Sequence, residues 1–580
     1  MKPMLLTAAE DLPTGPDWIY EVKYDGFRCL LHASEDGIKL WSRNGKDLSG
    51  RFPEICGFIP PADSLPFTID GELVIRNTRW QTNFSRLQTR GRLKKEAVIA
   101  RAARERPCTF VAFDHLTGGK QRLEERKRSL YALVQTIQHP HIVLSEVHTS
   151  LEKIKALVLL HRAEGIVAKH KKSLYSEGER SKQWLKWKNF RSVSGCLTAY
   201  DPANGYYDVT LMEETLGKFK NGLSAEEAET LQMFFKSNGE KQAGKWYVRP
   251  SVCADIHCLD AADGEMREPT FHRFRFDLTP ENCTKEKMEW DLSLYPEEVP
   301  VTNSDKQLWK NVSKKQYFQY IRHIAPYMLP FLAEKKLTVI RCPDGITAES
   351  FYQKQAPDHA PDYLDTWEEK DGSRILCNNL PSLLWLANQG AVEFHIPFDK
   401  TDASLPDEIV FDLDPPSRKH FSLAITAAQW MKQMLDEIGV ISFIKTSGNK
   451  GMQIHIPIQA GDFSYEETRN LTEAVAETLV QKCPDLFTVE RLKKKRGEKL
   501  YLDYVQHAEG KTIVAPYSAR RIDEATVACP LFWEEVKEGL RPESFTIKNV
   551  LARLEERGCP FLQYEEARKR QPVKQLKRLL

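Results

Sequence analysis

A lysine lies in the most chemically suggestive stretch of the sequence, the hexapeptide KYDGFR at positions 23–28. Its side-chain amine can act as a nucleophile, and a lysine two residues before an Asp-Gly turn suits covalent nucleotidyl transfer. A free lysine has a pKa of about 10.4, so freeing the amine at neutral pH costs roughly 4–5 kcal/mol. Burial or nearby cations must therefore lower the pKa of Lys23. A surface turn after a strand at 18–22 would explain the same residues equally well, so other motifs must decide.

A second reactive group consists of carboxylates far along the chain. Apolar and polar residues alternate over EIVFDLD at 408–414, which predicts a strand with Asp412 and Asp414 on one face, about 6.6 Å apart. Asp503 lies in another alternating run, KLYLDYV. Three acids on two strands can hold two divalent ions, an arrangement that activates a 3′-hydroxyl and stabilises a leaving pyrophosphate. An Asp-x-Asp pair alone is weak evidence, because turns also use such pairs.

The size and charge of the chain set limits on the interpretation. Its 580 residues suggest roughly three or four domains. Charged residues make up 28% of the chain but the net charge is only +2, so a nucleic-acid surface would need local segregation of lysine and arginine. The stretch 86–106 has eight basic and two acidic residues. A solvated helix face explains such a run about as often as phosphate contacts do.

The cysteines and the apolar runs indicate the compartment. The twelve cysteines are scattered without a Cys-x-x-Cys pair, and Cys253 and Cys258 lack a second pair at zinc-like spacing. We expect ordinary reduced thiols. No apolar run reaches the roughly 18–20 residues that span a bilayer, and the N-terminus lacks a secretion-signal pattern. These patterns predict a cytoplasmic protein that makes no membrane contact.

Five short motifs follow the lysine hexapeptide within the first 190 residues. They are SRNG at 42–45, IDGELV at 69–74, FVAFD at 110–114, EGIVAK at 164–169 and WLKWK at 184–188. Their order and span resemble the nucleotidyltransferase domain of ATP-dependent DNA ligases, which is related to RNA ligases and capping enzymes. The resemblance implies an adenylation domain of ATP-grasp-like ligase fold over residues 1–192, with Lys23 as its nucleophile.

The resemblance also implies roles for other residues of this domain. As a strand, WLKWK places Lys186 and Lys188 on one face, where they can clamp a triphosphate and lower the pKa of Lys23; solvated strand lysines are the alternative. Glu164 corresponds to a carboxylate that contacts Mg²⁺. The remaining nucleotide contacts implied are Arg28, Arg43 and Glu72 for ribose and phosphate, Phe113 for stacking on the purine, and Lys169 for phosphate. Residence in the core is the alternative for Phe113.

Short strands separated by turn residues follow over 193–280 and predict a small β-barrel of the oligonucleotide-binding (OB) class. Its segment REPTFHRFRFD, at 267–277, resembles the last ligase motif, a mobile basic element that orients pyrophosphate during lysine adenylylation. Arg273 and Arg275 fall on one face at strand spacing, and Arg275 is the implied cofactor contact. An ordinary basic edge strand would look similar.

A polar, proline-containing stretch ends the first half, and we expect a linker at 281–300. After it, the motifs DLDPP, SGNKG, LDY and APYSARR occur in an order that resembles the primase-polymerase domain of bacterial ligase D, the enzyme of non-homologous end joining. The resemblance implies such a domain, with an RRM-like core, over residues 301–580. The expected fold class is therefore multidomain α+β.

The turn between the two acidic strands, SGNKG at 447–451, suits a triphosphate through its backbone amides, Ser447 and Lys450. Many members of the family have histidine two residues after the last glycine, where this chain has Gln453. Strand alternation places Gln453 and His455 on one face, so we hypothesise that His455 partly replaces the missing imidazole. A core histidine is the alternative.

Four cations upstream of the acidic strands resemble the contacts that the family makes with a 5′-phosphate and a template. They are Lys306, Lys314, Arg341 and Lys354. Considered singly, each would be an ordinary surface cation.

Together these resemblances imply a bifunctional enzyme of DNA double-strand-break repair, with ligase and polymerase in the order of the Bacillus-type ligase D proteins and no phosphoesterase domain. The implied cofactors are ATP with Mg²⁺ or Mn²⁺. The implied partners are DNA ends, nicks and gaps, NTPs or dNTPs with ribonucleotides preferred, and the end-binding protein Ku; we expect a monomer that acts at the bacterial nucleoid. The rivals are an RNA-repair or capping nucleotidyltransferase and a DNA-end scaffold with inactive sites.

Overall fold

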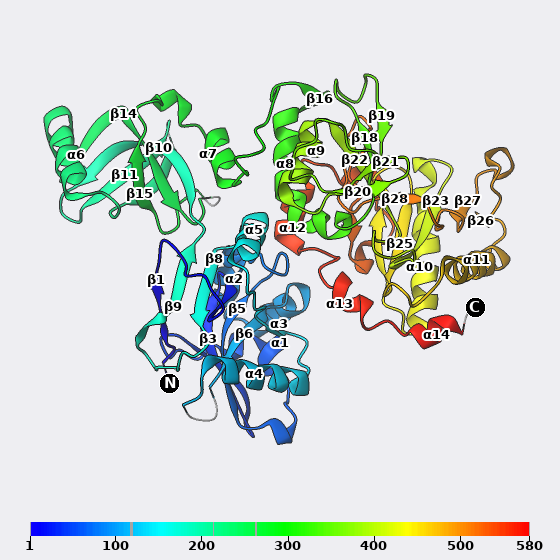
Figure 1. The fold of residues 1–580 in the computed structure, drawn as a ribbon, viewed down its shortest axis with the longest axis horizontal. Helices are drawn as coiled ribbons and strands as arrows, with labels where there is room; N and C mark the ends of the chain where they lie inside the picture. Colours follow the sequence, from blue (N-terminus) through cyan, green and yellow to red (C-terminus); the bar gives the residue numbers. More distant parts are fainter. Residues whose placement is uncertain (1, 117–119, 213, 262–263, 579–580) are drawn as a thin grey trace. The chain divides into compact units, whose positions relative to one another are not determined.

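The computed structural model describes residues 2–116, 120–212, 214–261 and 264–578. The chain divides into two compact units, Met1–Tyr295 and Pro296–Leu580. The stretch expected to be a linker contains a helix, α7 (Lys285–Leu292). Each unit combines sheets and helices (Figure 1), which confirms the multidomain α+β class.

Two sheets build the first 190 residues of the first unit. The smaller sheet has the order β1-β9-β8-β2 and the larger has the order β4-β3-β5-β6-β7. The strands of the smaller sheet are β1 (Leu5–Ala8), β2 (Trp18–Lys23), β8 (Gly165–His170) and β9 (Arg180–Lys188). Those of the larger sheet are β3 (Phe27–Ser34), β4 (Gly37–Ser42), β5 (Phe67–Val74), β6 (Thr109–His115) and β7 (Ile142–Leu144).

The two sheets share a core. Tyr20 and Val22 of β2 pack with Val74 of β5 and Val111 of β6 in one apolar cluster. Helix α5 packs on β2 and β8, and α4 packs on β6 and β7. The helices of this region are α1 (Pro53–Cys56), α2 (Phe84–Arg92), α3 (Glu96–Glu105), α4 (Leu123–Ile137) and α5 (Leu151–His161).

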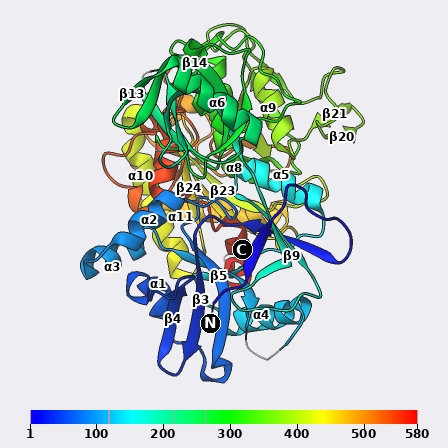
Figure 2. The ribbon, with the colours of Figure 1, turned by 90° about the vertical axis from the view of Figure 1, so that its left-hand side faces the viewer.

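The next strands form the predicted barrel. Their order is β12-β11-β10-β14-β13, with β15 also paired to β14. A bridge between Asn221, just after β12, and Thr270 of β15 curls the sheet back on itself, as a barrel requires. Helix α6 packs against β14, as Figure 2 shows, and also against β10. The elements are β10 (Arg191–Asp201), β11 (Tyr206–Leu211), β12 (Glu214–Phe219), α6 (Ala225–Asn238), β13 (Glu240–Gln242), β14 (Lys245–Cys258) and β15 (Thr270–Phe274).

The second unit has an RRM-like core in its larger sheet. The chain runs β23-α10-β24-β25-α11-β27, while the spatial order of these strands is β27-β23-β25-β24, which is the split βαβ arrangement. Strands β26 and β29 extend its two edges. The elements are β23 (Glu408–Asp414), α10 (Phe421–Glu437), β24 (Phe443–Thr446), β25 (Met452–Pro457), α11 (Tyr465–Lys482), β26 (Phe487–Thr488), β27 (Leu500–Asp503) and β29 (Pro530–Leu531).

A second sheet, β19-β18-β22-β28, and several helices complete this unit. The remaining strands of the second unit are β16 (Gln307–Trp309), β17 (Val312–Ser313), β18 (Thr338–Arg341), β19 (Phe351–Gln353), β20 (Thr366–Glu369), β21 (Gly372–Ile375), β22 (Ala391–Pro397) and β28 (Thr512–Val514). Its remaining helices are α8 (Lys314–Leu332), α9 (Leu380–Asn388), α12 (Val550–Arg557), α13 (Tyr564–Arg568) and α14 (Val573–Lys577). Among the described residues, no helix combines the length and apolar character that crossing a bilayer requires.

The tight packing between β5 and β6 makes Gly71 a test of this fold. A methyl group at Gly71 would lie 2.4 Å from ring carbons of Phe110 and 2.7 Å from the Val111 carbonyl oxygen. Overpacking of this kind typically costs about 1–3 kcal/mol, so Gly71→Ala should lower the thermal midpoint of the first unit in calorimetry. Gly50→Ala is the control, because its methyl group would meet no atom within 4 Å. Equal midpoints for the two variants would contradict this tight packing between β5 and β6.

Candidate active sites

Lys23 ends β2 directly opposite Gly165, the first residue of β8. This register brings its amine to Glu164, which precedes β8: the Nζ atom lies 2.6 Å from Oε2 of Glu164. The Lys23 side chain is 20% exposed and that of Glu164 is 7% exposed, so the pair is largely buried but part of Lys23 remains accessible. The predicted nucleophile and the predicted metal-contacting carboxylate are therefore neighbours.

The charge around Lys23 differs from the expectation that cations lower its pKa. Burial lowers the pKa of Lys23, but the carboxylates of Glu164, Glu72 and Asp25 raise it by more, so the pKa lies above its ordinary value. Without nucleotide or metal the amine is thus held as an ammonium ion. A free amine requires that cations compete for these carboxylates, as a bound metal ion would.

Glu72 and Arg28 lie beside each other on β5 and β3, where they are register partners. Burial raises the pKa of Glu72 to about 8 although Lys23 and Arg28 oppose this. Arg28 donates two hydrogen bonds to Asp70, of 2.8 and 3.2 Å, and Asp70 also accepts one from the Tyr175 hydroxyl at 2.7 Å. No local pattern indicated that Asp70 orients the guanidinium group of Arg28 or that Tyr175 in turn holds Asp70.

Phe113 is half-buried beneath two cations. The Arg28 guanidinium lies 5.4 Å and the Lys169 ammonium 4.5 Å from its ring centroid. Lys169 is itself buried and bonds Glu21 at 2.9 Å, and Lys127 also contacts Glu21. Burial lowers the pKa of Lys169 to about 8. The structure therefore ties Lys169 to Glu21 beneath the site, and it does not present this ammonium as a free phosphate contact.

The other predicted phosphate contacts lie nearby but differ in exposure. Lys186 and Lys188 alternate along β9 as expected, and the nearby Lys188 and Lys23 add to the effect of burial in lowering the pKa of Lys186. Lys188 forms an ion pair with Glu268. Arg43 follows β4 with an exposed side chain, and its backbone amide donates to the Arg28 carbonyl at 3.1 Å.

The basic segment 267–277 reaches the lysine site through a different arginine from the one expected. Arg267 donates two hydrogen bonds to Asp25, of 2.5 and 3.0 Å, two residues from Lys23. Arg275, the predicted contact, is held by Asp255 and Asp277 in the barrel. Strand alternation drew attention to the pair Arg273 and Arg275, whereas Arg267 lies before β15, where alternation gives no signal.

The second candidate site is the acidic cluster of the RRM-like sheet. Asp412 and Asp414 lie on β23 with their side chains on one face, and Asp412 is the register partner of Asp503 on β27. Burial, together with the charges of Asp414 and Asp503, raises the pKa of Asp412 to about 7. Burial also raises the pKa of Asp503. Three carboxylates that repel one another in this way form a site for cations.

Hydrogen bonds and basic side chains hold these carboxylates in the absence of a cation. Gln453 donates to Asp412 at 3.1 Å and accepts a hydrogen bond from the buried Lys445. Lys450 lies 2.9 Å from Asp414, and Tyr501 donates to Asp503 at 3.1 Å. Gln453 was expected only to mark a missing histidine. In the fold it contacts the carboxylate directly.

The glycine turn between β24 and β25 lies against the end of β23. A methyl group at Gly451 would come within 2.3 Å of the Leu413 carbonyl oxygen, so only glycine permits this approach. Ser447 closes the turn by accepting hydrogen bonds from the amides of Asn449 and Gly451, at 3.3 and 3.1 Å. Lys450 leaves the turn toward Asp414 and thus lies where a bound triphosphate could compete for it.

His455 lies apart from this group. Its Nδ1 atom is 2.8 Å from Glu408, which also accepts a hydrogen bond from the Tyr564 hydroxyl at 2.7 Å. The residue is 1% exposed, and burial lowers its pKa although Glu408 raises it. As strand alternation predicts, His455 lies on the same face of β25 as Gln453. The structure nevertheless assigns it to the buried core beside Glu408, four residues along β23 from Asp412, the partner of Gln453.

The four upstream cations form two groups in the second unit. Lys314 is buried at the start of α8, and burial together with the nearby Lys306 lowers its pKa to about 8. Lys306 lines an open depression of about 500 Å³ with Asn303, Ser304 and Asp305. Arg341 ends β18 and lies 5.2 Å from the ring centroid of Phe351, while Lys354 is exposed just after β19.

Comparison with known proteins places both sites in a family context. A family model described as ATP dependent DNA ligase domain matches residues 3–188, and one described as LigD, primase-polymerase domain matches residues 313–561. The bifunctional non-homologous end joining protein LigD of Bacillus subtilis is 39% identical over 97% of this chain and 96% of its own length. The multifunctional LigD of Pseudomonas aeruginosa is 25% identical over 98% of this chain and 73% of its own.

Among solved structures, the polymerase domain of Mycobacterium tuberculosis ligase D in complex with DNA is similar to part of the chain. It is 30% identical, with a TM-score of 0.44, over 47% of this chain and 99% of that domain.

Arg267 offers a test of the lysine site. Charge-assisted hydrogen bonds of this kind are worth about 1.5–3 kcal/mol, and about 1.4 kcal/mol is a tenfold change in rate. We therefore expect Arg267→Ala to slow covalent labelling of Lys23 by α-labelled ATP at least about tenfold. Arg273→Ala is the matched control, because Arg273 bonds Asp255 and is 60% exposed. Equal labelling rates in the two variants would refute a role for Arg267.

Proposed function

The chain belongs to the LigD family of bacterial non-homologous end-joining proteins, and we propose how its two sites share the repair of a DNA double-strand break. It is a bifunctional repair enzyme, an ATP-dependent DNA ligase joined to a primase-type polymerase. One observation supports a separate role for each of the two sites. A nucleophilic lysine beside Glu164 lies in the first unit, whereas the acidic cluster of Asp412, Asp414 and Asp503 lies in the second.

We propose that Lys23 is the nucleophile of the ligase. Its amine forms a bond to the α-phosphorus of ATP while the bond to pyrophosphate breaks, and the amine proton passes to solvent or a nearby carboxylate. The AMP group then moves to the 5′-phosphate of a nick, and the 3′-hydroxyl displaces AMP to seal the strand. Lys186 and Lys188 would bind phosphates, and Arg28, Arg43 and Glu72 would bind ribose and phosphate. Phe113 would stack on the purine.

Divalent cations fit both candidate sites by the chemistry of the donors. Carboxylate oxygens suit Mg²⁺ and Mn²⁺, and the raised pKa of Asp412 indicates a group whose ionised form needs a positive partner. Glu164 would hold an ion in the ligase, and Asp412, Asp414 and Asp503 would hold ions in the polymerase. When bound, such ions lower the charge on the phosphates and favour an ionised 3′-hydroxyl.

The polymerase residues have separate proposed roles. Ser447 and Lys450 would position the triphosphate of an incoming NTP or dNTP, with ribonucleotides preferred, and Gln453 would orient Asp412. The depression would take the 5′-phosphate of a gap, because Lys306 lines it and the buried Lys314 lies close to Lys306. Arg341 and Lys354 would contact the template strand.

We also propose the setting in which the enzyme acts. Its substrates would be the ends, nicks and gaps of duplex DNA, which in a bacterium lie in the cytoplasmic nucleoid. The end-binding protein Ku would recruit it, and a single copy would carry both sites. The rivals are less well supported: an RNA-repair or capping enzyme has no use for the second unit, and an inactive scaffold would not need the lysine, glutamate and aspartates.

Separate inactivation of the two sites tests the division of labour. On a gapped duplex with a 5′-phosphate, ATP and nucleotides, Lys23→Ala should fill the gap without sealing it, because the nucleophile is lost. Asp412→Ala should seal a simple nick but leave the gap open. Denaturing gel electrophoresis resolves the products. Loss of both activities in either variant, with the fold intact by calorimetry, would contradict two independent sites.

Substrate choice separates the ligase from its RNA-directed rival. We expect rapid sealing of a DNA nick and at least about tenfold slower sealing of an RNA nick of the same sequence. Addition of EDTA should abolish sealing, with recovery on adding Mg²⁺ or Mn²⁺, because the phosphates then lack a counter-ion. Preference for the RNA nick would favour the rival.

A further inference from the structure

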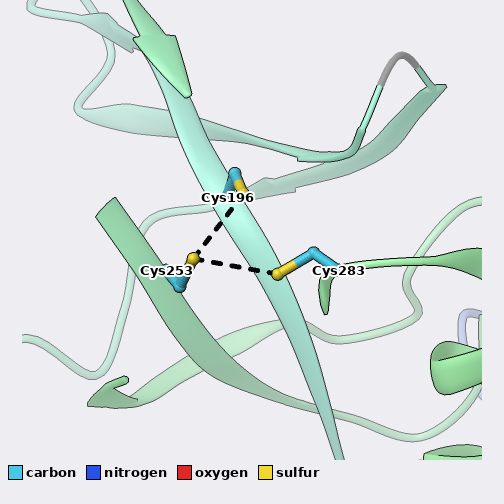
Figure 3. Close-up of side chains that lie close together, drawn as sticks. All are labelled: Cys196, Cys253 and Cys283. Carbon is cyan, nitrogen blue, oxygen red and sulfur yellow. Dashed lines mark hydrogen bonds between the residues drawn. The ribbon is translucent and has the colours of Figure 1, made fainter. Parts of the chain in front are cut away.

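Three buried cysteines meet in the barrel of the first unit, outside both proposed active sites. Cys196 on β10 and Cys253 on β14 are register partners, and Cys283 follows the short 3-10 helix Pro280–Asn282. The Sγ atom of Cys253 lies 3.8 Å from that of Cys196 and 3.9 Å from that of Cys283 (Figure 3). Cys196 and Cys283 are fully buried, and Cys253 is 3% exposed.

These separations match those of thiolates that share one metal ion. A zinc–sulfur bond is about 2.3 Å long, so two sulfurs of a tetrahedral site lie about 3.8 Å apart. Within the described part of the chain, this is the only group of three or more histidine, cysteine or acidic side chains whose ligand atoms all lie within 4.8 Å of one another. The motif spacing gave no hint of it, because the ligands come from three separate segments.

A fourth donor lies beside the thiols. The backbone carbonyl oxygen of Thr279 accepts a hydrogen bond from the Cys283 thiol at 4.0 Å and another from the Asn282 amide at 2.9 Å. A carbonyl oxygen has two lone pairs, and loss of the Cys283 thiol proton on metal binding would make one of them available to the ion. The surrounding cluster is apolar and contains Leu197, Ala254 and Met288, which would exclude water. Such a closed environment is typical of structural rather than catalytic metal sites.

We propose that Cys196, Cys253 and Cys283 bind one thiophilic d¹⁰ cation, Zn²⁺, with the Thr279 carbonyl available as a fourth ligand. Binding forms three zinc–sulfur bonds and releases three thiol protons to solvent, and no electron is transferred. The ion has a structural role. It pins residues 279–283, which lead into α7, onto β10 and β14 of the barrel.

The full-length protein provides the test. Reduced protein that has been supplemented with zinc and desalted should retain one equivalent of zinc more than the Cys253→Ala variant retains. Mass spectrometry of the metal measures this zinc. The acidic cluster can also bind zinc, so cobalt serves as a second probe. Cobalt bound to thiolates shows sulfur-to-metal charge-transfer absorption, which carboxylates do not produce. We expect this absorption in the wild type and in Asp412→Ala.

Two cysteine variants provide the contrast. Cys253→Ala should lose the charge-transfer absorption and the extra zinc, whereas Cys258→Ala should keep both, because Cys258 is buried on the same strand but lies outside the group. If Cys253→Ala fails to fold, Cys283→Ala replaces it. Absence of the absorption in the wild type, or equal absorption in the two variants, would overturn the proposal. Recovery of ten rather than twelve free thiols in denaturant without metal would also overturn it, by indicating a disulfide.

Discussion

The register between neighbouring strands is the constraint on which both sites depend. Opposite Lys23 in β2 lies Gly165 in β8, and this pairing brings the lysine amine to Glu164. Opposite Asp412 in β23 lies Asp503 in β27, and this pairing brings three carboxylates together. A shift of one residue would turn each of these side chains to the other face of its sheet. The apolar cores beneath the strands oppose such a shift, so packing remote from the chemistry preserves the chemistry.

At each site, charged side chains are paired with oppositely charged side chains of the same chain. Glu164 holds Lys23 as an ammonium ion, and Lys450 neutralises Asp414. In the proposed reactions, phosphates and metal ions would replace these partners, so substrate binding would exchange one set of ion pairs for another. Such exchange costs less than burying a bare charge, because each group keeps a partner throughout.

Much of the fold and of both sites was predictable from local patterns. Alternation located β23 and the side of the sheet that carries Asp412 and Asp414. The motif order identified the ligase and polymerase halves. The patterns were less informative for cations. Lys169 proved to be bound to Glu21 beneath the site, and Arg267 rather than Arg275 reaches Asp25. Each of these pairings joins side chains from different segments, so no spacing within one segment could indicate it.

The types of reactive residue, their order and the secondary structure that carries them followed from the chain alone, because hydrophobic periodicity and turn chemistry act over a few neighbouring residues. Which of these residues meet was decided by tertiary structure. Gln453 contacts Asp412 while His455 turns to Glu408, and Cys283 joins Cys196 and Cys253 across 87 positions of chain. The physical reason is that contact between distant residues depends on how sheets pair and pack. That outcome is settled by the burial of the whole core and not by any local stretch.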